Sequence, residues 1–397
     1  MKIDSPVQAL ATGAPLDLTL VRSEFPALDS DWAFLDNAGG SLVLRRVADR
    51  VRDYLLSRGA SPRLDADERV TAARRSVAEL VNAAHDDELV LGDSSTALMG
   101  QLTDAVRPGI AEGDEIIVTD SDHEAHIASW MALRRAGAVV KVWTLNRDSL
   151  ALELDDLDAL LGPRVRWLAM AHASNVLGTV NPVEAVATRV HAAGARLCVD
   201  AAAYAPHRLV DVQASEADAY VFSFHKLFGP RHAVLWSRRG LLPALPGSPC
   251  HELAYGCIGI SEYLRAIGAS LGVEGDARRR MRAAFEAFEQ QEDLLAERLL
   301  SFLRSKRNVR IIGLPTVRGR RRLPTISFTV SGQLSEDVVR HGDRFGLGIR
   351  FGDFDAPRLI QALGLEVQGG VVRVSMAHYN TLDEIDRLVR YLDRIIT

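Results

Sequence analysis

Short apolar runs alternate with segments of helical character between residues 88 and 235, and this alternation restricts the possible folds more than any other feature. The runs read ELVLG, EIIVT, AVVKVWTL, VRWLAMA, RLCVD, AYVFSF and AVLW, and a helix is expected from Ser95. This order is typical of a largely parallel sheet with helices on both faces. Such sheets bind ligands at the carboxyl ends of their strands, where Asp200, Lys226 and residues 172–175 are expected.

The character of the sequence changes after Gly256. A final helix is expected to begin at Thr381, where Glu384 completes a capping box. Before it, the pattern predicts a long amphipathic helix and two strands, at about residues 277–303, 325–330 and 371–376. The mixture indicates a second, smaller α+β domain.

The length of the chain, 397 residues, exceeds one typical core. Pro6, Pro15 and Pro26 mark an N-terminal segment expected to pack as an arm on another part of the structure. The predicted division is an arm, a large domain and a small domain, at residues 1–30, 31–262 and 263–397.

Composition gives no electrostatic argument for a nucleic-acid or membrane partner. The net charge is −5, with 25% charged and 47% hydrophobic residues. No apolar run approaches the length of a membrane span, and the N-terminus MKIDSPVQAL lacks the apolar stretch of a secretory signal. We therefore expect a cytoplasmic protein.

The arginine clusters fit ordinary structural roles, and of the cysteines only Cys250 and Cys257 could reach a substrate. Arginines at 278–280 and 318–322 are expected on the solvated surface. The cysteines, Cys198, Cys250 and Cys257, form neither a disulfide framework nor a four-ligand metal site.

Lys226 and Asp200 follow two of the predicted strands, 26 positions apart. Lys226 lies in VFSFHKLFGP, between polar neighbours and before a Gly-Pro turn. An amine and a carboxylate at two strand ends match the needs of pyridoxal phosphate, which forms a Schiff base with the amine and keeps its ring nitrogen protonated beside the anion. A purely structural buried ion pair is the alternative.

Hydroxyl groups near the same edge could hold the phosphate of such a cofactor. Ser94 and Ser95 follow a strand and open a helix, where backbone N–H groups also favour an anion. Serines at this position also cap helices without binding anything. Ser223 and His225, beside the lysine, could supply further phosphate donors.

The segment DHEAH contains two histidines, His123 and His126, without the spacing of a metal-binding HExxH motif. We therefore predict no metal site. A single imidazole can instead stack on a pyridine ring and offer an acid/base nitrogen. His123 is the candidate for that role, and His126 is interpreted as structural.

Two further segments could contact a substrate. HASN, ending at Asn175, places amide and hydroxyl groups at the end of a strand. Arg373, in VVRVSM, could bind a carboxylate through two hydrogen bonds, although arginines in short strands often face water.

Together these motifs resemble the class V aminotransferase family of fold-type I pyridoxal-phosphate enzymes, and within it the cysteine desulfurase-like proteins. The resemblance covers nearly the whole chain. The segments that carry it are LDNAGG from Leu35, DSSTAL, DHEAHIASW, HASNVLGT, VDAAAYAPH, FSFHKLFGP and RVSMAHYNT.

The resemblance implies an α/β large domain with a mostly parallel sheet and a smaller α+β domain. It implies that Lys226 binds pyridoxal 5'-phosphate covalently, Asp200 pairs with its ring nitrogen and His123 stacks on the ring. It further implies phosphate contacts by Ser95, Ser223 and His225, and substrate-carboxylate contacts by Asn175 and Arg373. These enzymes resemble one another in forming homodimers with shared sites, so Ser248 would reach the phosphate of the neighbouring subunit.

Two positions depart from the family pattern. Desulfurases carry a nucleophilic cysteine in an RxGxxC loop, and the matching stretch here ends in Asp355. A carboxylate cannot accept sulfur as a persulfide. Ala203 stands where relatives place a glutamine or histidine against the phenolic oxygen of the cofactor.

The sequence thus favours an enzyme that removes the Cα proton of an amino acid, with Lys226 as the base. Loss of a β-substituent, as in a C–S lyase, needs no enzyme cysteine and is the first hypothesis. Asp353 and Asp355 could then contact the substrate or protonate the leaving atom, or simply form an acidic loop. Transamination and epimerisation use the same starting step and are alternatives. A non-catalytic family member is a further alternative.

Overall fold

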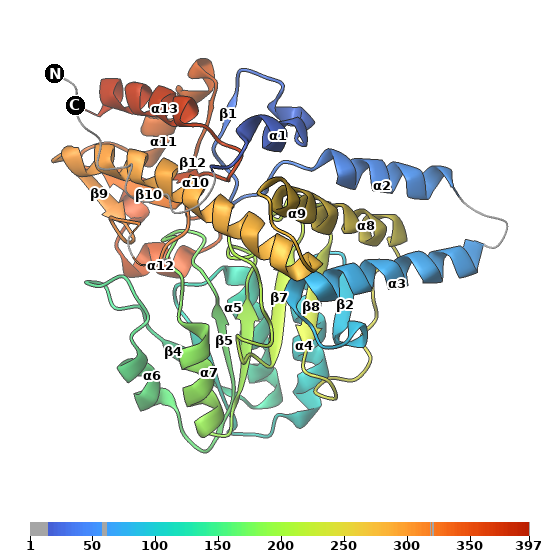
Figure 1. Cartoon of the computed structure of the whole chain (residues 1–397). Helices are drawn as coiled ribbons and strands as arrows, with labels where there is room; N and C mark the ends of the chain where they lie inside the picture. Colours follow the sequence, from blue (N-terminus) through green and yellow to red (C-terminus); the bar gives the residue numbers. More distant parts are fainter. Residues whose placement is uncertain (1–14, 58–61, 318, 320, 397) are drawn as a thin grey trace.

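The computed structural model describes residues 15–57, 62–317, 319 and 321–396, and within them a seven-stranded sheet forms the base of the molecule (Figure 1). The strand order is β2-β8-β7-β6-β5-β3-β4. Strand β8 runs antiparallel to both neighbours and the other pairs are parallel, so the expected largely parallel sheet is confirmed. The strands are β2 (Leu89–Gly92), β3 (Glu115–Thr119), β4 (Val139–Trp143), β5 (Val165–Ala171), β6 (Arg196–Asp200), β7 (Ala219–Ser223) and β8 (Ala233–Ser237).

Alternating side chains of each strand supply two apolar cores, one on each face of this sheet. In β5, Leu168 and Met170 join the core that contains the apolar residues of α7, whereas Trp167 and Ala169 join the core that contains those of α4 and α5. The alternation follows from the two-residue period of a strand. The covering helices are α4 (Ser95–Val106), α5 (Glu124–Met131) and α7 (Val183–Ala192).

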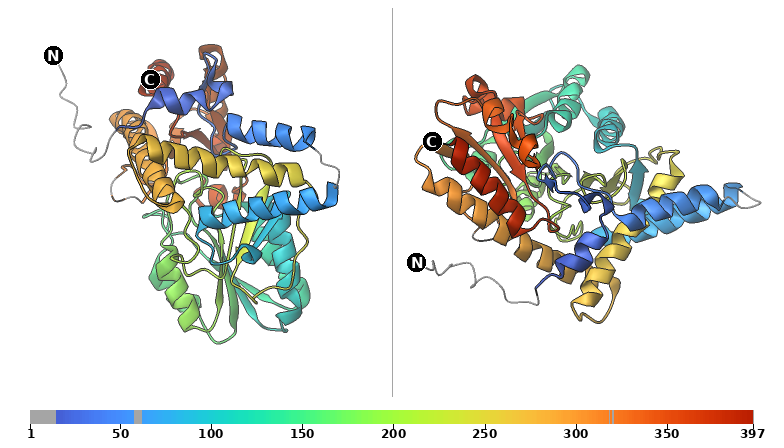
Figure 2. Two further views of the ribbon diagram at one scale, coloured as in Figure 1. Left: turned by 45° about the vertical axis from the view of Figure 1, so that its right-hand side comes forward. Right: turned by 90° about the horizontal axis from the view of Figure 1, so that it is seen from above.

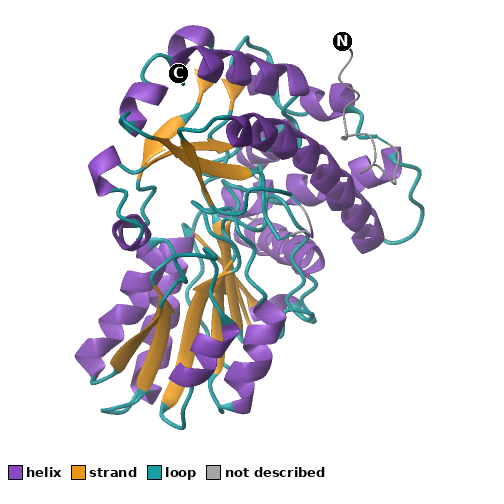
Figure 3. Cartoon of the chain, turned by 90° about the vertical axis from the view of Figure 1, so that its left-hand side faces the viewer, coloured by secondary structure: helices purple, strands orange, loops and turns teal. Residues whose placement is uncertain are grey.

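A second, four-stranded antiparallel sheet with the order β12-β13-β10-β9 lies apart from the first (Figure 3). Its strands are β9 (Val309–Ile312), β10 (Thr325–Val330), β12 (Arg350–Gly352) and β13 (Val371–Ser375). Helices α10 (Ala277–Ser305) and α13 (Leu382–Ile395) share its core. The expected long helix, the two strands and the Thr381–Glu384 capping box are confirmed.

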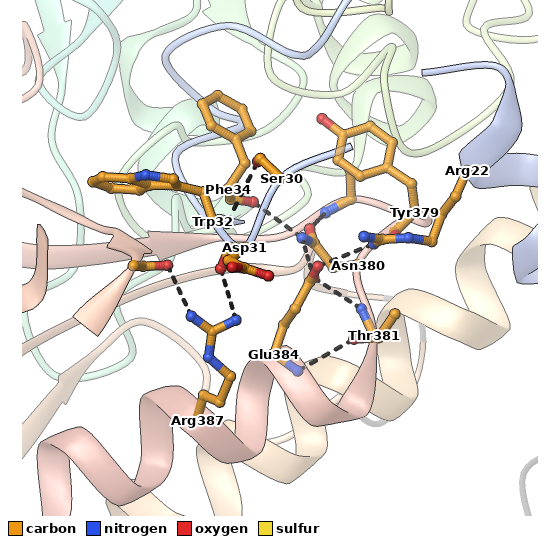
Figure 4. A network of polar contacts seen from close by, with 12 residues as sticks. Arg22, Ser30, Asp31, Trp32, Phe34, Tyr379, Asn380, Thr381, Glu384 and Arg387 are labelled. Carbon is orange, nitrogen blue, oxygen red and sulfur yellow. Dashed lines mark hydrogen bonds and ion pairs between the residues drawn. The ribbon is translucent and has the colours of Figure 1, made fainter. Parts of the chain in front are cut away.

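The N-terminal segment packs against the C-terminal part of the chain (Figure 4). Helix α1 (Leu18–Ser23) presents Arg22, which donates a hydrogen bond of 2.8 Å to the Tyr379 carbonyl and pairs with Glu384 at 3.0 Å. Arg387 of α13 donates to the Asp31 carbonyl at 2.9 Å. Strand β1 (Ala33–Phe34) then pairs with β11 (Leu347–Gly348). Residues 1–14 of the expected arm lie outside the described residues.

Helices α2 (Arg45–Leu56) and α3 (Pro62–Val81) lie beside α8 (His251–Gly256) and α9 (Ile258–Ser270). One end of α2 and one end of α3 project from the body of the molecule (Figure 2). None of the helices in the described residues combines the length and the apolar character that crossing a membrane requires. The remaining short helices are η2 (Pro26–Leu28), η3 (Asp86–Glu88), η4 (Arg107–Gly109), η5 (Ala132–Ala136), α6 (Leu154–Leu160), α11 (Ser335–Val339), η7 (Gly342–Phe345), α12 (Pro357–Ala362) and η8 (Glu366–Gln368).

The expectation that arginines 318–322 lie on the solvated surface is wrong for Arg322. Its side chain is 1% exposed and donates hydrogen bonds to backbone carbonyls, at 3.2 Å to Leu323 and 2.7 Å to Thr325. A guanidinium has five donors, which can satisfy several carbonyls that no strand partner reaches. Burial lowers the pKa of Arg322 to about 10.

Candidate active site

A cavity of about 480 Å³ opens at the carboxyl ends of β5, β6 and β7 and is closed on the other side by residues of the second sheet. This is the edge where the sequence predicts a ligand. The predicted site residues that line the cavity are Ser95, His123, Asn175, Asp200, Ala203, Ser223, His225, Lys226, Asp355 and Arg373.

Lys226 lies in a tight turn directly after β7. The backbone N–H groups of Leu227 and Gly229 both donate to the Phe224 carbonyl at 2.8 Å. Phe228 adopts a left-handed conformation with φ of 60°, and its N–H donates to the Ser41 hydroxyl at 2.7 Å. A non-glycine residue takes this conformation only where its surroundings enforce it. The turn therefore holds the lysine on a fixed backbone.

Burial lowers the pKa of the Lys226 amine, and the negative charge of Asp200 partly opposes this effect. The other lysines of the described residues differ, because each has a carboxylate partner. Lys141 pairs with Glu115 at 2.6 Å and Lys306 pairs with Asp393 at 2.7 Å. A buried amine that loses its proton readily suits covalent chemistry.

Asp200 ends β6, and its Oδ1 accepts a hydrogen bond of 2.8 Å from the Ala202 N–H. The same carboxylate lines the cavity. Behind it lies Asp122, which is 2% exposed and accepts a hydrogen bond of 2.8 Å from the Ala171 N–H. Burial raises the pKa of Asp122 to about 7. Asp122 is the first residue of the DHEAH motif, and nothing in the spacing of that motif predicted that its carboxylate is buried.

The hydroxyl groups predicted to hold phosphate have different environments. The Ser223 hydroxyl is buried and has no hydrogen-bond partner within the described part of the chain. Ser95 and its neighbour Thr96, which the sequence interpretation passed over, line the cavity. Ser94 instead caps α4, accepting a hydrogen bond of 3.1 Å from the Ala97 N–H, as the capping alternative predicts.

His225, beside the lysine, also lines the cavity. Burial is the main cause that lowers the pKa of His225 to about 4, and the nearby Lys226 adds to the effect. The imidazole is therefore neutral at pH 7. A neutral imidazole can still donate one hydrogen bond to an anion.

His123 caps α5, and each of its ring nitrogens has a polar neighbour. Its Nδ1 accepts a hydrogen bond of 3.2 Å from the Ala125 N–H, and its Nε2 lies 3.3 Å from Oδ2 of Asp355. His126 is 3% exposed, and neither of its ring nitrogens has a hydrogen-bond partner in the described residues. No group of three histidine, cysteine or acidic side chains in these residues could hold a metal ion.

Arg373 and Asn175 lie side by side at the top of the cavity. Arg373 is 3% exposed, donates to Asp36 Oδ1 at 2.9 Å, and has its guanidinium carbon 3.7 Å from the ring centre of Phe354. Asn175 donates from Nδ2 to the Phe354 carbonyl at 2.8 Å. Asp36 was missed although it lies in LDNAGG, a segment that carries the family resemblance. Phe354 was missed in RFGDFD, the stretch that departs from the family pattern at Asp355.

Two predicted positions lie elsewhere. His172 stacks on Tyr204 with ring centres 3.6 Å apart and lines a separate hollow, so HASN contributes Asn175 but not His172 to the cavity. Ser248 contacts Asp93 and lines another hollow of about 270 Å³, with Arg74 and His251. Within one chain, Ser248 does not meet the other site residues.

The residues of the cavity fit pyridoxal phosphate. They offer a buried amine of lowered pKa, a carboxylate at the next strand end, and a buried Ser223 hydroxyl without a partner among the described residues. A buried hydroxyl without a hydrogen bond is costly unless a ligand satisfies it.

Comparison with known proteins agrees with this chemistry. Residues 33–388 match the family described as Aminotransferase class-V. The chain belongs to this family. Members of the family are pyridoxal-phosphate enzymes of fold type I, so this class V protein is a pyridoxal-phosphate-dependent enzyme with that fold.

Individual relatives are similar over nearly their whole length. The aminotransferase-like protein FGM3 of Gibberella zeae is 35% identical over 402 residues, covering 95% of this chain and 98% of the relative. The cysteine desulfurase-like protein ustD of Aspergillus flavus is 32% identical, covering 96% and 91%. The crystal structure of the cysteine desulfurase CsdA from Escherichia coli superposes with a TM-score of 0.83 at 27% identity, covering 96% and 98%.

Proposed function

We propose that this enzyme removes the Cα proton of an amino acid and expels a substituent from Cβ, acting as a desulfurase-like C–S lyase that forms no persulfide. The observation that carries the proposal is the composition of the cavity wall. Lys226 and Asp200 line the cavity, and so does Asp355, which lies in a loop of the second sheet. None of the three cysteines, all of which lie in the described residues, lines it.

The positions of the cysteines support a route without persulfide. Cys198 is buried within β6, where burial raises the pKa of its thiol, and burial raises the pKa of Cys257 as well. Cys250 immediately precedes α8. A sulfur-accepting residue must present a thiolate to the reacting atom, and none of these three cysteines lines the cavity of its own chain.

The family resemblance suggests the roles of the residues, and their places in the cavity wall support it. Lys226 would hold pyridoxal phosphate, with Asp200 at the ring nitrogen and His123 on the ring face. Ser95, Ser223 and His225 would bind the phosphate, and Arg373 and Asn175 the substrate carboxylate. Ala203 would offer no side-chain donor to the phenolic oxygen of the cofactor.

Bound pyridoxal phosphate supplies an electron sink that stabilises negative charge at Cα. Lys226 performs the proton transfer, because its lowered pKa leaves a neutral amine available at lower pH than an ordinary lysine. The low exposure of Arg373 keeps the carboxylate site away from bulk water, which strengthens its attraction for an anion.

Transamination is the second candidate. The family description and the name of the relative FGM3 both point to amino transfer. The same lysine and cavity would serve, and the products would differ, because the amino group would stay with the enzyme and the β-substituent with the oxo acid. Epimerisation would return the proton without loss of either group.

Product analysis distinguishes these reactions. The holoenzyme is incubated with a cysteine S-conjugate that releases a coloured thiol. Elimination with water gives one thiol, one pyruvate and one ammonia per substrate, and Lys226→Ala should abolish all three. An oxo acid that retains the sulfur substituent, or an inverted substrate, would reject elimination in favour of the corresponding alternative.

A further inference from the structure

Asp355 meets His123 across the cavity from a loop of strained backbone. Phe354 and Asp355 both adopt left-handed conformations, with φ of 54° and 58°. This conformation is uncommon for phenylalanine but less so for aspartate, and the Asp355 N–H also donates to Oδ1 of Asp353 at 3.1 Å. Strain of this kind gathers at functional sites, where a side chain must be aimed.

Contacts from α5 and from the segment that follows β5 hold the loop in place. The Glu124 N–H donates to the Asp355 carbonyl at 2.7 Å, and Asn175 Nδ2 donates to the Phe354 carbonyl at 2.8 Å. Arg358 makes a two-pronged pair with Glu124 at 2.8 and 3.0 Å. The carboxylate of Asp355 is therefore directed at the first turn of α5, where His123 is the cap.

The contacts of Nδ1 and Nε2 together indicate which ring nitrogen of a neutral His123 carries the proton. A ring nitrogen that accepts a hydrogen bond carries no proton, so Nδ1, which accepts from the Ala125 N–H, is unprotonated. A neutral imidazole then has its proton on Nε2, which faces Oδ2 of Asp355 at 3.3 Å. The doubly protonated ring would turn a second N–H toward that of Ala125.

We propose that Asp355 is a positioning residue that holds His123 as the neutral Nε2–H tautomer. A nitrogen that already carries a proton cannot accept another, so His123 does not serve as the base through Nε2, and the Cα proton passes to Lys226. The inference rests on the proposed function only in setting His123 beside the cofactor. The tautomer itself is a property of the protein without substrate.

Ring-nitrogen NMR of cofactor-free protein with ¹⁵N-labelled histidine tests this assignment, and His123→Gln identifies the signals. We expect an unprotonated Nδ1 signal and a protonated Nε2 signal, well separated. Asp355→Asn should preserve them, because its amide oxygen can take the place of the carboxylate oxygen that faces Nε2–H. Asp355→Gly suits the left-handed backbone but removes the acceptor, so the two signals should move toward each other.

Kinetics provide the second measurement. Asp355→Gly should lower kcat by up to about 100-fold through misplacement of the imidazole, with a smaller change in KM. Asp355→Asn should recover most of the activity, and Glu366→Gln, which removes an exposed carboxylate of η8, should change neither measurement.

A wild-type signal pattern with the proton on Nδ1, or an Asp355→Gly spectrum identical to that of the wild type, would overturn the inference. If the wild type shows the expected tautomer but releases no thiol from S-conjugates, the proposed function fails and this inference stands. If the wild type releases thiol but carries the proton on Nδ1, the proposed function stands and this inference fails.

Discussion

Lys226 differs from the other described lysines in its surroundings rather than in its chemistry. Lys141 and Lys306 have carboxylate partners within 2.7 Å, whereas burial acts on Lys226 and lowers its pKa. Removing an ammonium group from water disfavours its charged form, and one unit of pKa corresponds to about 1.4 kcal/mol. The fold therefore prepares this amine before any cofactor binds.

Uptake of pyridoxal phosphate should show this preparation directly. Attachment needs the neutral amine, so the rate of appearance of the visible absorption band should rise with pH. Because the pKa of Lys226 is lowered, the rise should level off at a lower pH than for a free lysine, whose pKa is about 10.4. Stopped-flow mixing of cofactor-free protein with pyridoxal phosphate measures this rate at each pH. If the rate reaches half its maximum at the same pH as for a model amine, burial has no effect on Lys226.

The sequence predicted much of this site because its residues sit in motifs at strand ends. Asp200, Lys226 and His123 follow apolar runs directly, and such positions meet at one edge of a parallel sheet. Asp36 and Phe354 were missed because both contact Arg373 from other segments of the chain. Asp36 lies more than 300 residues from Arg373 and Phe354 about 20, and no local sequence pattern predicts such contacts. The His123–Asp355 contact was missed for the same reason.

Helix α13 shows how local sequence signals determine an element. Thr381 caps it, accepting a hydrogen bond of 3.2 Å from the Glu384 N–H, and the Glu384 side chain accepts from the Thr381 N–H at 3.1 Å. Glu384 also pairs with Arg22 of the N-terminal segment at 3.0 Å. The capping box could be predicted from the sequence. The ion pair with Arg22 could not, because it joins opposite ends of the chain.

Replacing this cap should weaken the helix measurably. Thr381→Ala removes the acceptor for the Glu384 N–H and should lower the free energy of unfolding by about 1 kcal/mol. Thr381→Ser keeps the hydroxyl and serves as the matched control. Urea unfolding followed by circular dichroism measures both variants. Equal midpoints for the alanine and serine variants would show that the cap contributes nothing.

At the scale of the whole molecule, the cavity draws on both sheets. Asp200 and Lys226 come from the large sheet, whereas Arg373 belongs to the small one. The division at residues 30 and 262 stays a prediction. Ala33 and Leu35 pack in the core of the small sheet, and residue 262 lies within α9. Amphipathic patterns reveal each core, but they do not show which core a short segment joins.

The predicted dimer gives a role to Ser248, which lies outside the cavity of its own chain. Light scattering should give about twice the 43.4 kDa mass of one chain.

If Ser248 reaches the phosphate of the neighbouring subunit, Ser248→Ala loses a hydrogen bond to a charged group, and the Kd for pyridoxal phosphate should rise roughly 10-fold or more. Ser270→Ala, at the exposed end of α9, is the control. A dimer with unchanged Kd would remove Ser248 from the site.

Lys226 is the proposed point of cofactor attachment, and the small number of lysines in the chain allows a direct test. The lysines of the chain are Lys2, Lys141, Lys226 and Lys306. Reduction of the holoenzyme with borohydride fixes the cofactor to its amine, and mass spectrometry of the peptides locates it. We predict the added mass on the peptide that contains Lys226. The same mass on a peptide with any other lysine, or on none, would contradict the account.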